Sequence, residues 1–290
     1  MFYLTLAVVF NLLLLVIIKY FERFNIPAIQ GIVVNYFAAG TTALIFSGTT
    51  FSIHEIVHAD FFSFSFILGA LFISVFYAIS VTAQQMGMAV ASVANKMSVV
   101  IPVASAFILY GDTVTTLKIV AIALALISVY FATRTSKNES VENKKSKNIL
   151  FPVFVFFGSG IIDALVNFAN KRLIHSESEN ALFSALLFFV AGFIGLFWLL
   201  YLTLIKKQPF YFKSVVGGIL LGIPNFFSIY FILKALETGF LESSSLYPIL
   251  NVLIVVFSAL VGYILFAEKL NKINLAGIVL AILAILLIMI

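Results

Sequence analysis

Residues 86–110 read MGMAVASVANKMSVVIPVASAFILY, and residues 240–266 read FLESSSLYPILNVLIVVFSALVGYILF. Each stretch is long enough to cross a bilayer, which needs roughly 20 mostly apolar residues. Each also carries an asparagine and a proline in its interior. We interpret the two stretches as copies of one helix, which predicts that the whole chain consists of two copies of one repeat.

The rest of the sequence supports this duplication. A shift of 152 positions places Lys19 on Lys171, Ala39-Gly40 on Ala191-Gly192, Gly87 on Gly239 and Ser92 on Ser244. With four extra residues in the second copy, Asn95 falls on Asn251 and Asp112 on Glu268. Several matches in one order, at the same spacing, favour an internal repeat.

Ten apolar stretches are predicted as membrane spans, at about 2–18, 29–47, 63–82, 86–110, 114–132, 149–170, 181–205, 214–234, 240–266 and 273–290. We predict a first repeat at 1–134, a polar linker loop at 135–148 and a second repeat at 149–290. An odd number of crossings in each copy makes tandem copies insert in opposite senses, a construction of secondary transporters. The predicted fold class is an all-α membrane protein with ten transmembrane helices in two inverted five-helix repeats.

The composition agrees with a lipid environment. Apolar residues make up 63% of the 290 residues and charged residues only 10%, whereas a soluble domain is about half apolar and a quarter charged. The net charge of +5 therefore does not indicate nucleic-acid binding. The chain has no cysteine, which excludes disulfides and thiolate metal sites. The first apolar stretch has no basic segment before it, so we expect a retained helix and not a signal peptide.

The basic residues predict the orientation, because they gather in cytoplasmic loops. With the N-terminus outside, four basic residues fall in outer loops: Lys118, Lys171, Arg172 and Lys234. Twelve fall in inner loops: Lys19, Arg23, Arg134, Lys137, Lys144, Lys145, Lys147, Lys206, Lys207, Lys213, Lys269 and Lys272. We therefore expect a multi-pass protein of the cell (inner) membrane with both termini on its outer face.

Lys96 is the strongest candidate for a functional residue. It lies in the middle of the fourth predicted span, among residues compatible with lipid. A charge there costs at least ~2.5–3.5 kcal/mol on insertion scales, so the side chain is expected to face protein or a watery cavity. The functional interpretation is a site for an anionic substrate group or a coupling charge. The structural alternative is a buried ion pair.

Asp163 is the second charged residue within a span. Helical spacing places it on one face with Asn167 and Asn170. An aspartate at this depth takes a proton, binds an amine, or pairs with Lys96, and the sequence leaves all three alternatives open.

Further polar residues follow the same spans. Glu242 begins the ninth span, where a solvated helix start is the simpler interpretation. The other members of the predicted substrate-binding or coupling set are Asn95, Tyr77, Tyr247 and Asn251. Prolines at positions 102, 224 and 248 are expected to interrupt three spans, and interrupted helices mark transporter sites.

One motif favours an enzyme. His54, Glu55 and His58 match H-E-x-x-H, which on a helix presents two zinc ligands and a general base. Such a site needs a third ligand. Asp60 is too close in sequence to be an obvious one, whereas His175, on a loop of the same predicted outer face, stays open on geometric grounds. The alternatives are therefore an intramembrane zinc hydrolase and a chance match in a short interfacial helix. We predict no catalytic residue and no metal.

Taken together, the chain resembles the EamA-type branch of the drug/metabolite transporter superfamily. The resemblance rests on the five-plus-five repeat, the lysine after the first span of each copy (Lys19, Lys171), and the two quoted stretches. These stretches end in the turns Gly111-Asp112 and Ala267-Glu268. The resemblance implies a ten-helix exporter or exchanger of small metabolites. It also implies that the first, third, fourth, sixth, eighth and ninth helices surround a cavity, which places Lys96, Asp163 and Glu242 on cavity helices.

We therefore predict a multi-pass secondary transporter of small metabolites, such as amino acids or related compounds, working by alternating access. Lys96 is expected to attract an anionic group, and Asp163 or Glu242 to balance charge or couple protons. The predicted partners are the lipid bilayer and a small-molecule metabolite, with no nucleic acid, for a monomer or homodimer. No cofactor is expected, apart from coupled protons. The alternatives are the zinc hydrolase and a membrane scaffold without transport.

Overall fold

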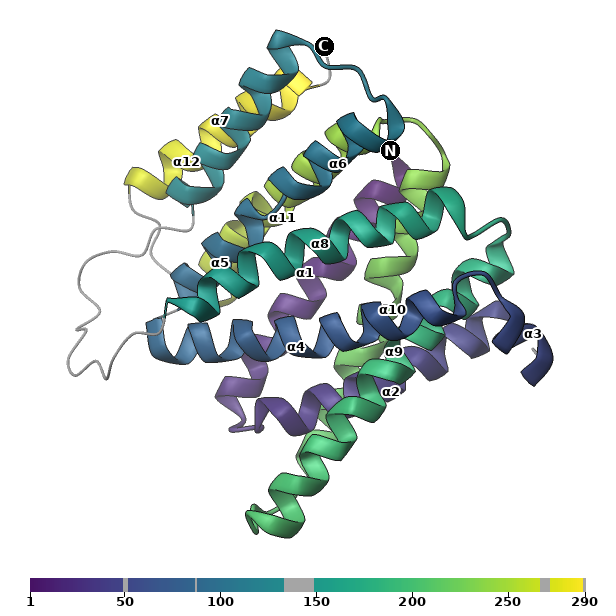
Figure 1. Ribbon diagram of the computed structural model, residues 1–290. Helices are drawn as coiled ribbons and strands as arrows, with labels where there is room; N and C mark the ends of the chain where they lie inside the picture. Colours follow the sequence, from purple (N-terminus) through teal and green to yellow (C-terminus); the bar gives the residue numbers. More distant parts are fainter. Residues whose placement is uncertain (49–51, 87, 133–148, 267–271, 289–290) are drawn as a thin grey trace. The chain divides into compact units, whose positions relative to one another are not determined.

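The computed structural model describes residues 1–290 except 49–51, 87, 133–148, 267–271 and 289–290 (Figure 1). Within these described residues the chain forms helices and no strands. The helices of the first half are α1 Phe2–Arg23, α2 Ala28–Ser47, α3 Ile53–His58, α4 Phe62–Met86, α5 Met88–Met97, α6 Val100–Tyr110 and α7 Thr116–Ala132. Those of the second half are α8 Leu150–Arg172, α9 Glu177–Leu200, the π-helix η1 Tyr201–Ile205, α10 Phe212–Glu237, α11 Ser243–Phe266 and α12 Lys272–Ile288.

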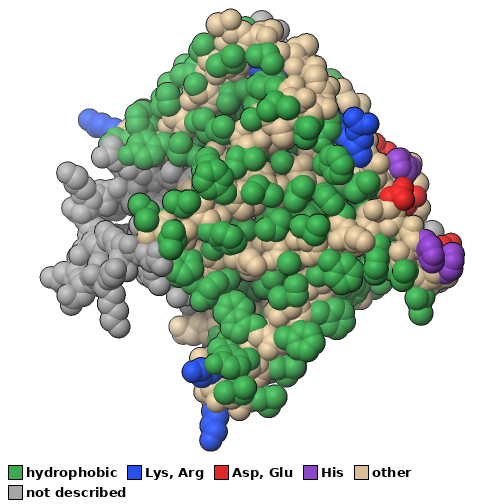
Figure 2. Space-filling view, viewed as in Figure 1, with side chains coloured by type: hydrophobic (Ala, Val, Ile, Leu, Met, Phe, Trp, Pro, Cys, Tyr) green, Lys and Arg blue, Asp and Glu red, His purple; other side chains and the backbone are tan. Residues whose placement is uncertain are grey.

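The helices follow the apolar stretches of the sequence. Seven are long and apolar enough to cross a membrane, and three shorter apolar segments lie at Ala94–Tyr110, Thr116–Phe131 and Lys272–Leu287. Each of the ten predicted spans contains one of these segments. Large apolar side chains cover the face seen in Figure 2, as lipid contact requires. The predicted all-α membrane fold is confirmed.

The prolines have different effects. Residues 98 and 99 separate α5 from α6, three residues before Pro102. Pro224 and Pro248, in contrast, lie inside the continuous helices α10 and α11. The expectation that all three prolines interrupt their spans was therefore wrong for two of them.

The chain divides into two compact units, with two boundaries inside α4 and α8 and a third between α10 and α11. Unit 1 contains Met1–Ser74 and Leu165–Thr238, and unit 2 contains Val75–Ala164 and Gly239–Ile290. Each unit therefore draws segments from both predicted repeats. The second and seventh predicted spans pack together as α2 and α9 in unit 1, and the fifth and tenth as α7 and α12 in unit 2. The division into repeats at 135–148 remains a prediction, and all of that linker lies outside the described residues.

Unit 1 is built around α2, which packs against α9 and α10, while α1 packs against α10. Small residues let α10 approach α2 closely, as in other membrane helix pairs. A Cβ atom on Gly222 would lie 2.6 Å from the Asn35 carbonyl oxygen, and one on Gly218 would lie 2.6 Å from that of Gly31. The Asn225 side chain donates a hydrogen bond to the Asn35 side chain at 3.2 Å, which fixes the pair at this depth.

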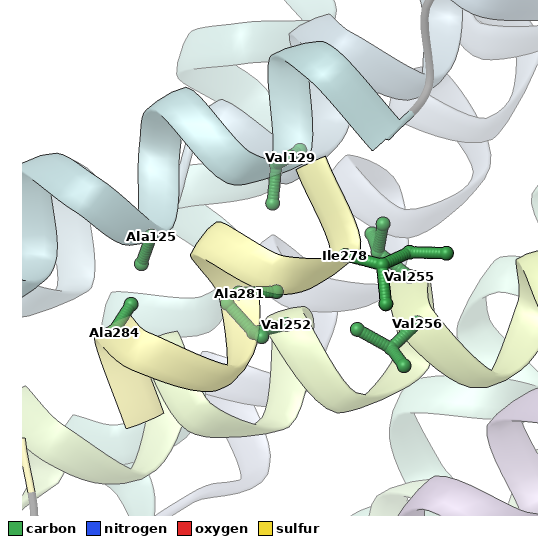
Figure 3. Packing of buried hydrophobic residues seen from close by; sticks show 8 residues of the cluster. All are labelled: Ala125, Val129, Val252, Val255, Val256, Ile278, Ala281 and Ala284. Carbon is green, nitrogen blue, oxygen red and sulfur yellow. The ribbon is translucent and has the colours of Figure 1, made fainter. Parts of the chain in front are cut away.

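Unit 2 has its apolar core where α7, α11 and α12 meet (Figure 3). The helices approach closely because many of the facing side chains are small. The buried members are Ala125, Val129, Val252, Val255, Val256, Ile278, Ala281 and Ala284. A hydrogen bond of 3.2 Å from Asn274 to the Phe131 carbonyl joins α12 to the end of α7. Together with the contact between α6 and α11, this core supports the helices that carry the candidate site.

Candidate functional site

The break between α5 and α6 is the centre of the candidate site. A proline removes one N–H donor, and its ring clashes with the carbonyl four residues earlier, which for Pro102 is that of Ser98. The helix accordingly ends at Met97 and begins again at Val100. Lys96 lies in the last turn of α5, where the carbonyl ends of the helix favour a positive charge.

Helix α8 touches this break through a glycine. A Cβ atom on Gly160 would lie 2.5 Å from the Ile101 side chain and 2.7 Å from the Ser98 carbonyl oxygen. Only a residue without a side chain allows this approach. Asp163 is three residues further along α8, on the same helical face. The glycine contact therefore fixes the position of the aspartate relative to α5.

Helix α11 supplies two polar side chains to the same region. The Tyr247 hydroxyl donates a hydrogen bond to the Asp163 backbone carbonyl at 3.0 Å. The Lys96 ammonium donates one to the Asn251 side-chain oxygen at 3.4 Å. Tyr247 and Asn251 are one helical turn apart. We call these four residues, Lys96, Asp163, Tyr247 and Asn251, the Lys96 cluster; the structure thus brings together four of the predicted site residues.

The two charges of the Lys96 cluster are not joined directly. Lys96 and Asp163 interact electrostatically, and each is partly exposed. The ion pairs within 4 Å among the described residues do not include them. An ammonium has three donors, and the bond from Lys96 to Asn251 is the one that the described residues provide. The cluster can therefore offer donors to an anionic group while a carboxylate remains close by.

Glu242 lies in a different arrangement, at the start of α11. Its carboxylate forms an ion pair with Lys118 of α7. It also accepts hydrogen bonds from the Thr113 hydroxyl at 3.0 and 3.1 Å and from the Thr113 backbone N–H at 3.3 Å. The Lys118 ammonium reaches the Thr113 carbonyl at 3.3 Å as well. We call Lys118, Thr113 and Glu242 the Lys118 cluster.

The electrostatics of the Lys118 cluster favour a structural role. Burial alone would raise the pKa of Glu242, but the hydrogen bonds from Lys118 and Thr113 outweigh it and hold the pKa below its ordinary value. Asp112 accepts a hydrogen bond from the Ser244 backbone N–H at 2.9 Å. Both carboxylates thus lie at the N-terminus of α11, where the helix dipole stabilises negative charge.

Three further predicted residues are not joined to the Lys96 cluster by any side-chain hydrogen bond given for the described residues. The Asn95 backbone carbonyl accepts a hydrogen bond from the Ser98 hydroxyl at the helix break. Tyr77 of α4 is 41% exposed and meets the Phe151 ring edge-on. Asn167 is fully buried in unit 1. Their assignment to a substrate site stays a prediction.

Sequence reasoning missed Lys118, which it counted as a loop charge. The signal that would have found it is the pair of opposite charges near the ends of two spans, the fifth and the ninth, on one predicted face. It also missed Glu177 of unit 1, which accepts a hydrogen bond from the Tyr230 hydroxyl and pairs with Lys234 at 3.4 Å.

The H-E-x-x-H motif forms the short helix α3. The Glu55 carboxylate accepts hydrogen bonds from the Ser52 backbone N–H and hydroxyl, at 2.7 and 2.8 Å. The hydrogen bond from the Ser52 backbone contributes most to lowering the pKa of Glu55, and the hydrogen bond from the Ser52 hydroxyl contributes next. The His54 and His58 rings stack with centroids 3.9 Å apart. No group of three metal-ligating side chains occurs in the described part of the chain, so nothing here supports the zinc hydrolase.

The apolar helices, several of them long enough to cross a bilayer, define the fold of a multi-pass membrane protein. Residues 150–290, within the predicted second repeat, match the EamA-like transporter family. The resemblance drawn from the sequence is thereby confirmed. An uncharacterised protein of Haemophilus influenzae is 28% identical over 285 residues, covering 96% of this chain and 94% of its own length.

The fold also has a match among solved structures. One crystal structure aligns with a TM-score of 0.76, covering 99% of this chain and 94% of that chain, at 9% sequence identity. At this identity the match shows a shared fold and nothing about the transported compound.

Proposed function

We propose that this membrane transporter is a secondary carrier of small metabolites, such as amino acids or related compounds, that works by alternating access around a central cavity. The observation that supports this proposal is the Lys96 cluster, in which an ammonium within a spanning segment keeps donors available beside a carboxylate that forms no ion pair within 4 Å among the described residues. We propose that the protein acts in the cell inner membrane without catalytic activity, as a monomer or homodimer.

Lys96 and Asn251 bind an anionic group of the substrate. In a low-dielectric site, hydrogen bonds to charged groups contribute more than those between neutral groups, about 1.5–3 kcal/mol each. Asp163 balances the charge of Lys96 when the site is empty. It also carries the coupled proton or contacts a cationic part of the substrate. The break beside Lys96 adds backbone groups that a continuous helix would have bonded internally.

Both termini face the outside in this proposal, because basic residues are enriched in the loops then placed inside. The absence of cysteine from the whole sequence makes a direct test possible. Single substitutions Ser178→Cys and Gln208→Cys place one thiol on each predicted face. In intact cells, a membrane-impermeant maleimide is expected to label the first and not the second. The reverse labelling pattern would overturn the orientation.

The substrate site is tested in two steps. A thermal-shift screen of metabolites on detergent-solubilised protein identifies a compound that binds the folded form, since such a ligand raises the melting temperature. Counterflow of that compound in proteoliposomes is then compared for the native chain, Lys96→Ala and the exposed control Lys272→Ala. Lys96→Ala is expected to reduce counterflow roughly tenfold to a hundredfold, which corresponds to the loss of one charge-assisted hydrogen bond. Equal counterflow in all three proteins would rule out Lys96 as part of the substrate site.

Asp163→Asn separates charge balance from proton coupling. If Asp163 carries the proton, this variant is expected to retain substrate exchange but to lose uptake driven by a pH gradient. Asp60→Asn, on an exposed loop position, is the matched control and keeps both. Uptake by Asp163→Asn that still follows the pH gradient would assign the coupling to another group.

A further inference from the structure

A basic surface in unit 1 is not used by the proposed transport site. It comprises the end of α1 and the loop between η1 and α10, with Arg23, Lys206, Lys207 and Lys213. Over residues 19–27 and 206–213 the sequence has five basic residues against one acidic residue, Glu22. We call the four named residues, together with the loop 206–213, the basic loop surface. In Figure 2, Lys and Arg side chains lie over the end of α9 that leads into this loop.

Buried hydrogen bonds hold this loop in place. The Gln30 side chain, only 3% exposed, donates to the Pro209 carbonyl at 2.8 Å. Its oxygen accepts from the Tyr211 backbone N–H at 3.1 Å and from the Ser214 hydroxyl at 3.0 Å. The Gln30 amide thus uses both acceptor positions of its oxygen and one of its two N–H donors to fix the loop. The positive charges are therefore presented at defined positions.

The two segments of the surface are also joined to each other. The Lys213 ammonium donates a hydrogen bond to the Phe24 carbonyl at 2.9 Å, directly after Arg23. Lys206 contacts the Tyr201 ring, with its ammonium 6.0 Å from the ring centroid. Lys207 has positive φ, +53°, and has no hydrogen-bond or ion-pair partner within the described residues. Two adjacent ammonium groups thus remain available to an anion.

Exposed apolar side chains flank these charges. Leu204 is 73% exposed and Phe212 is 78% exposed, and Ile205, Phe210 and Tyr211 are exposed as well. Aromatic residues beside lysines are typical of the membrane–water interface, where the rings lie at headgroup depth and the charges reach the headgroups. A soluble anion would use the charges but would leave these apolar side chains without a partner.

We propose that the basic loop surface binds the phosphate headgroup of an anionic phospholipid, with Lys206 and Lys207 as the main contacts and the flanking apolar side chains among the acyl chains. The loop lies on the predicted cytoplasmic side, where anionic lipids attract basic segments. The inference is independent of the substrate and of the Lys96 cluster.

The test titrates short-chain phosphatidylglycerol into the full-length protein in detergent and follows the melting temperature, with phosphatidylcholine as the neutral lipid. The native chain is expected to melt higher with phosphatidylglycerol. Lys206→Gln/Lys207→Gln is expected to need roughly thirtyfold more phosphatidylglycerol for the same shift, because each of the two basic residues contributes ~1 kcal/mol near the surface. Lys144→Gln/Lys145→Gln, which removes the same charge from the linker, is the matched control and is expected to behave like the native chain.

Three results would overturn the proposal. One is an equal shift in the loop variant and the native chain. Another is an equal loss in the linker control, which would indicate attraction by overall charge only. The third is a full shift with inorganic phosphate alone, which would assign the surface to a free anion. Lys206→Arg/Lys207→Arg keeps the charge and is expected to restore the native response, which separates binding from a folding defect.

Discussion

Two lysines of unit 2, Lys96 and Lys118, lie in contrasting surroundings. Lys118 is buried at the start of α7 and forms a direct ion pair with Glu242. Lys96 lies inside a span, and its ammonium donates a hydrogen bond of 3.4 Å to the neutral side chain of Asn251. The carboxylate of Asp163 stays beyond direct pairing distance from Lys96, whereas that of Glu242 also accepts hydrogen bonds from the hydroxyl and the backbone N–H of Thr113.

The difference separates a structural charge from a binding charge. A buried charge is retained where its partners satisfy it, and removing one partner leaves the other uncompensated. A charge inside a span that is not satisfied costs stability, which selection tolerates at functional sites. Lys118 therefore has the surroundings of a residue that anchors α7 to α11, and Lys96 has the surroundings of a ligand-binding residue.

The largest expected effect comes from changing the contact that positions Asp163. In Gly160→Val, the new side chain meets the Ser98 carbonyl, a backbone atom that cannot move aside cheaply. Overpacking of this kind costs about 1–3 kcal/mol. The melting temperature and counterflow are both expected to fall. The exposed neighbour Ile161→Ala is the control, and native behaviour of Gly160→Val would show that the comparison does not depend on this contact.

An intermediate effect is expected when each lysine is removed together with its carboxylate. Lys118→Met/Glu242→Gln is expected to lose on the order of 1 kcal/mol, because Glu242 is partly exposed and solvent screens the pair. Lys96→Met/Asp163→Asn is expected to keep or raise stability while abolishing transport, since it removes two charges that are not directly paired. Melting temperatures in detergent and counterflow measure both. A drop in stability for the Lys96 double variant that equals or exceeds that of the Lys118 variant would break the distinction.

The sequence allowed the spans to be predicted more fully than the site. Hydropathy over about 20 residues depends on composition alone, so each predicted span contains an observed apolar helix. Mid-span charge likewise identified Lys96 and Asp163. The partner of Glu242 was not predictable in the same way, because Lys118 is remote in sequence and the pairing depends on how α7 packs against α11. Nor did composition indicate that Pro102 breaks its helix whereas Pro224 and Pro248 do not.

The smallest expected effect concerns pH and the Lys118 cluster. Because the folded protein lowers the pKa of Glu242, this group contributes stability that is present above the ordinary glutamate pKa, about 4.3. That contribution is lost as the pH falls through the lower folded value. Glu242→Gln should therefore melt below the native chain at neutral pH, and the difference should narrow as the pH falls below about 4. The exposed Glu237→Gln controls for surface charge, and a gap between Glu242→Gln and the native chain that widens in acid would contradict the assignment of Glu242 as an ionised structural partner.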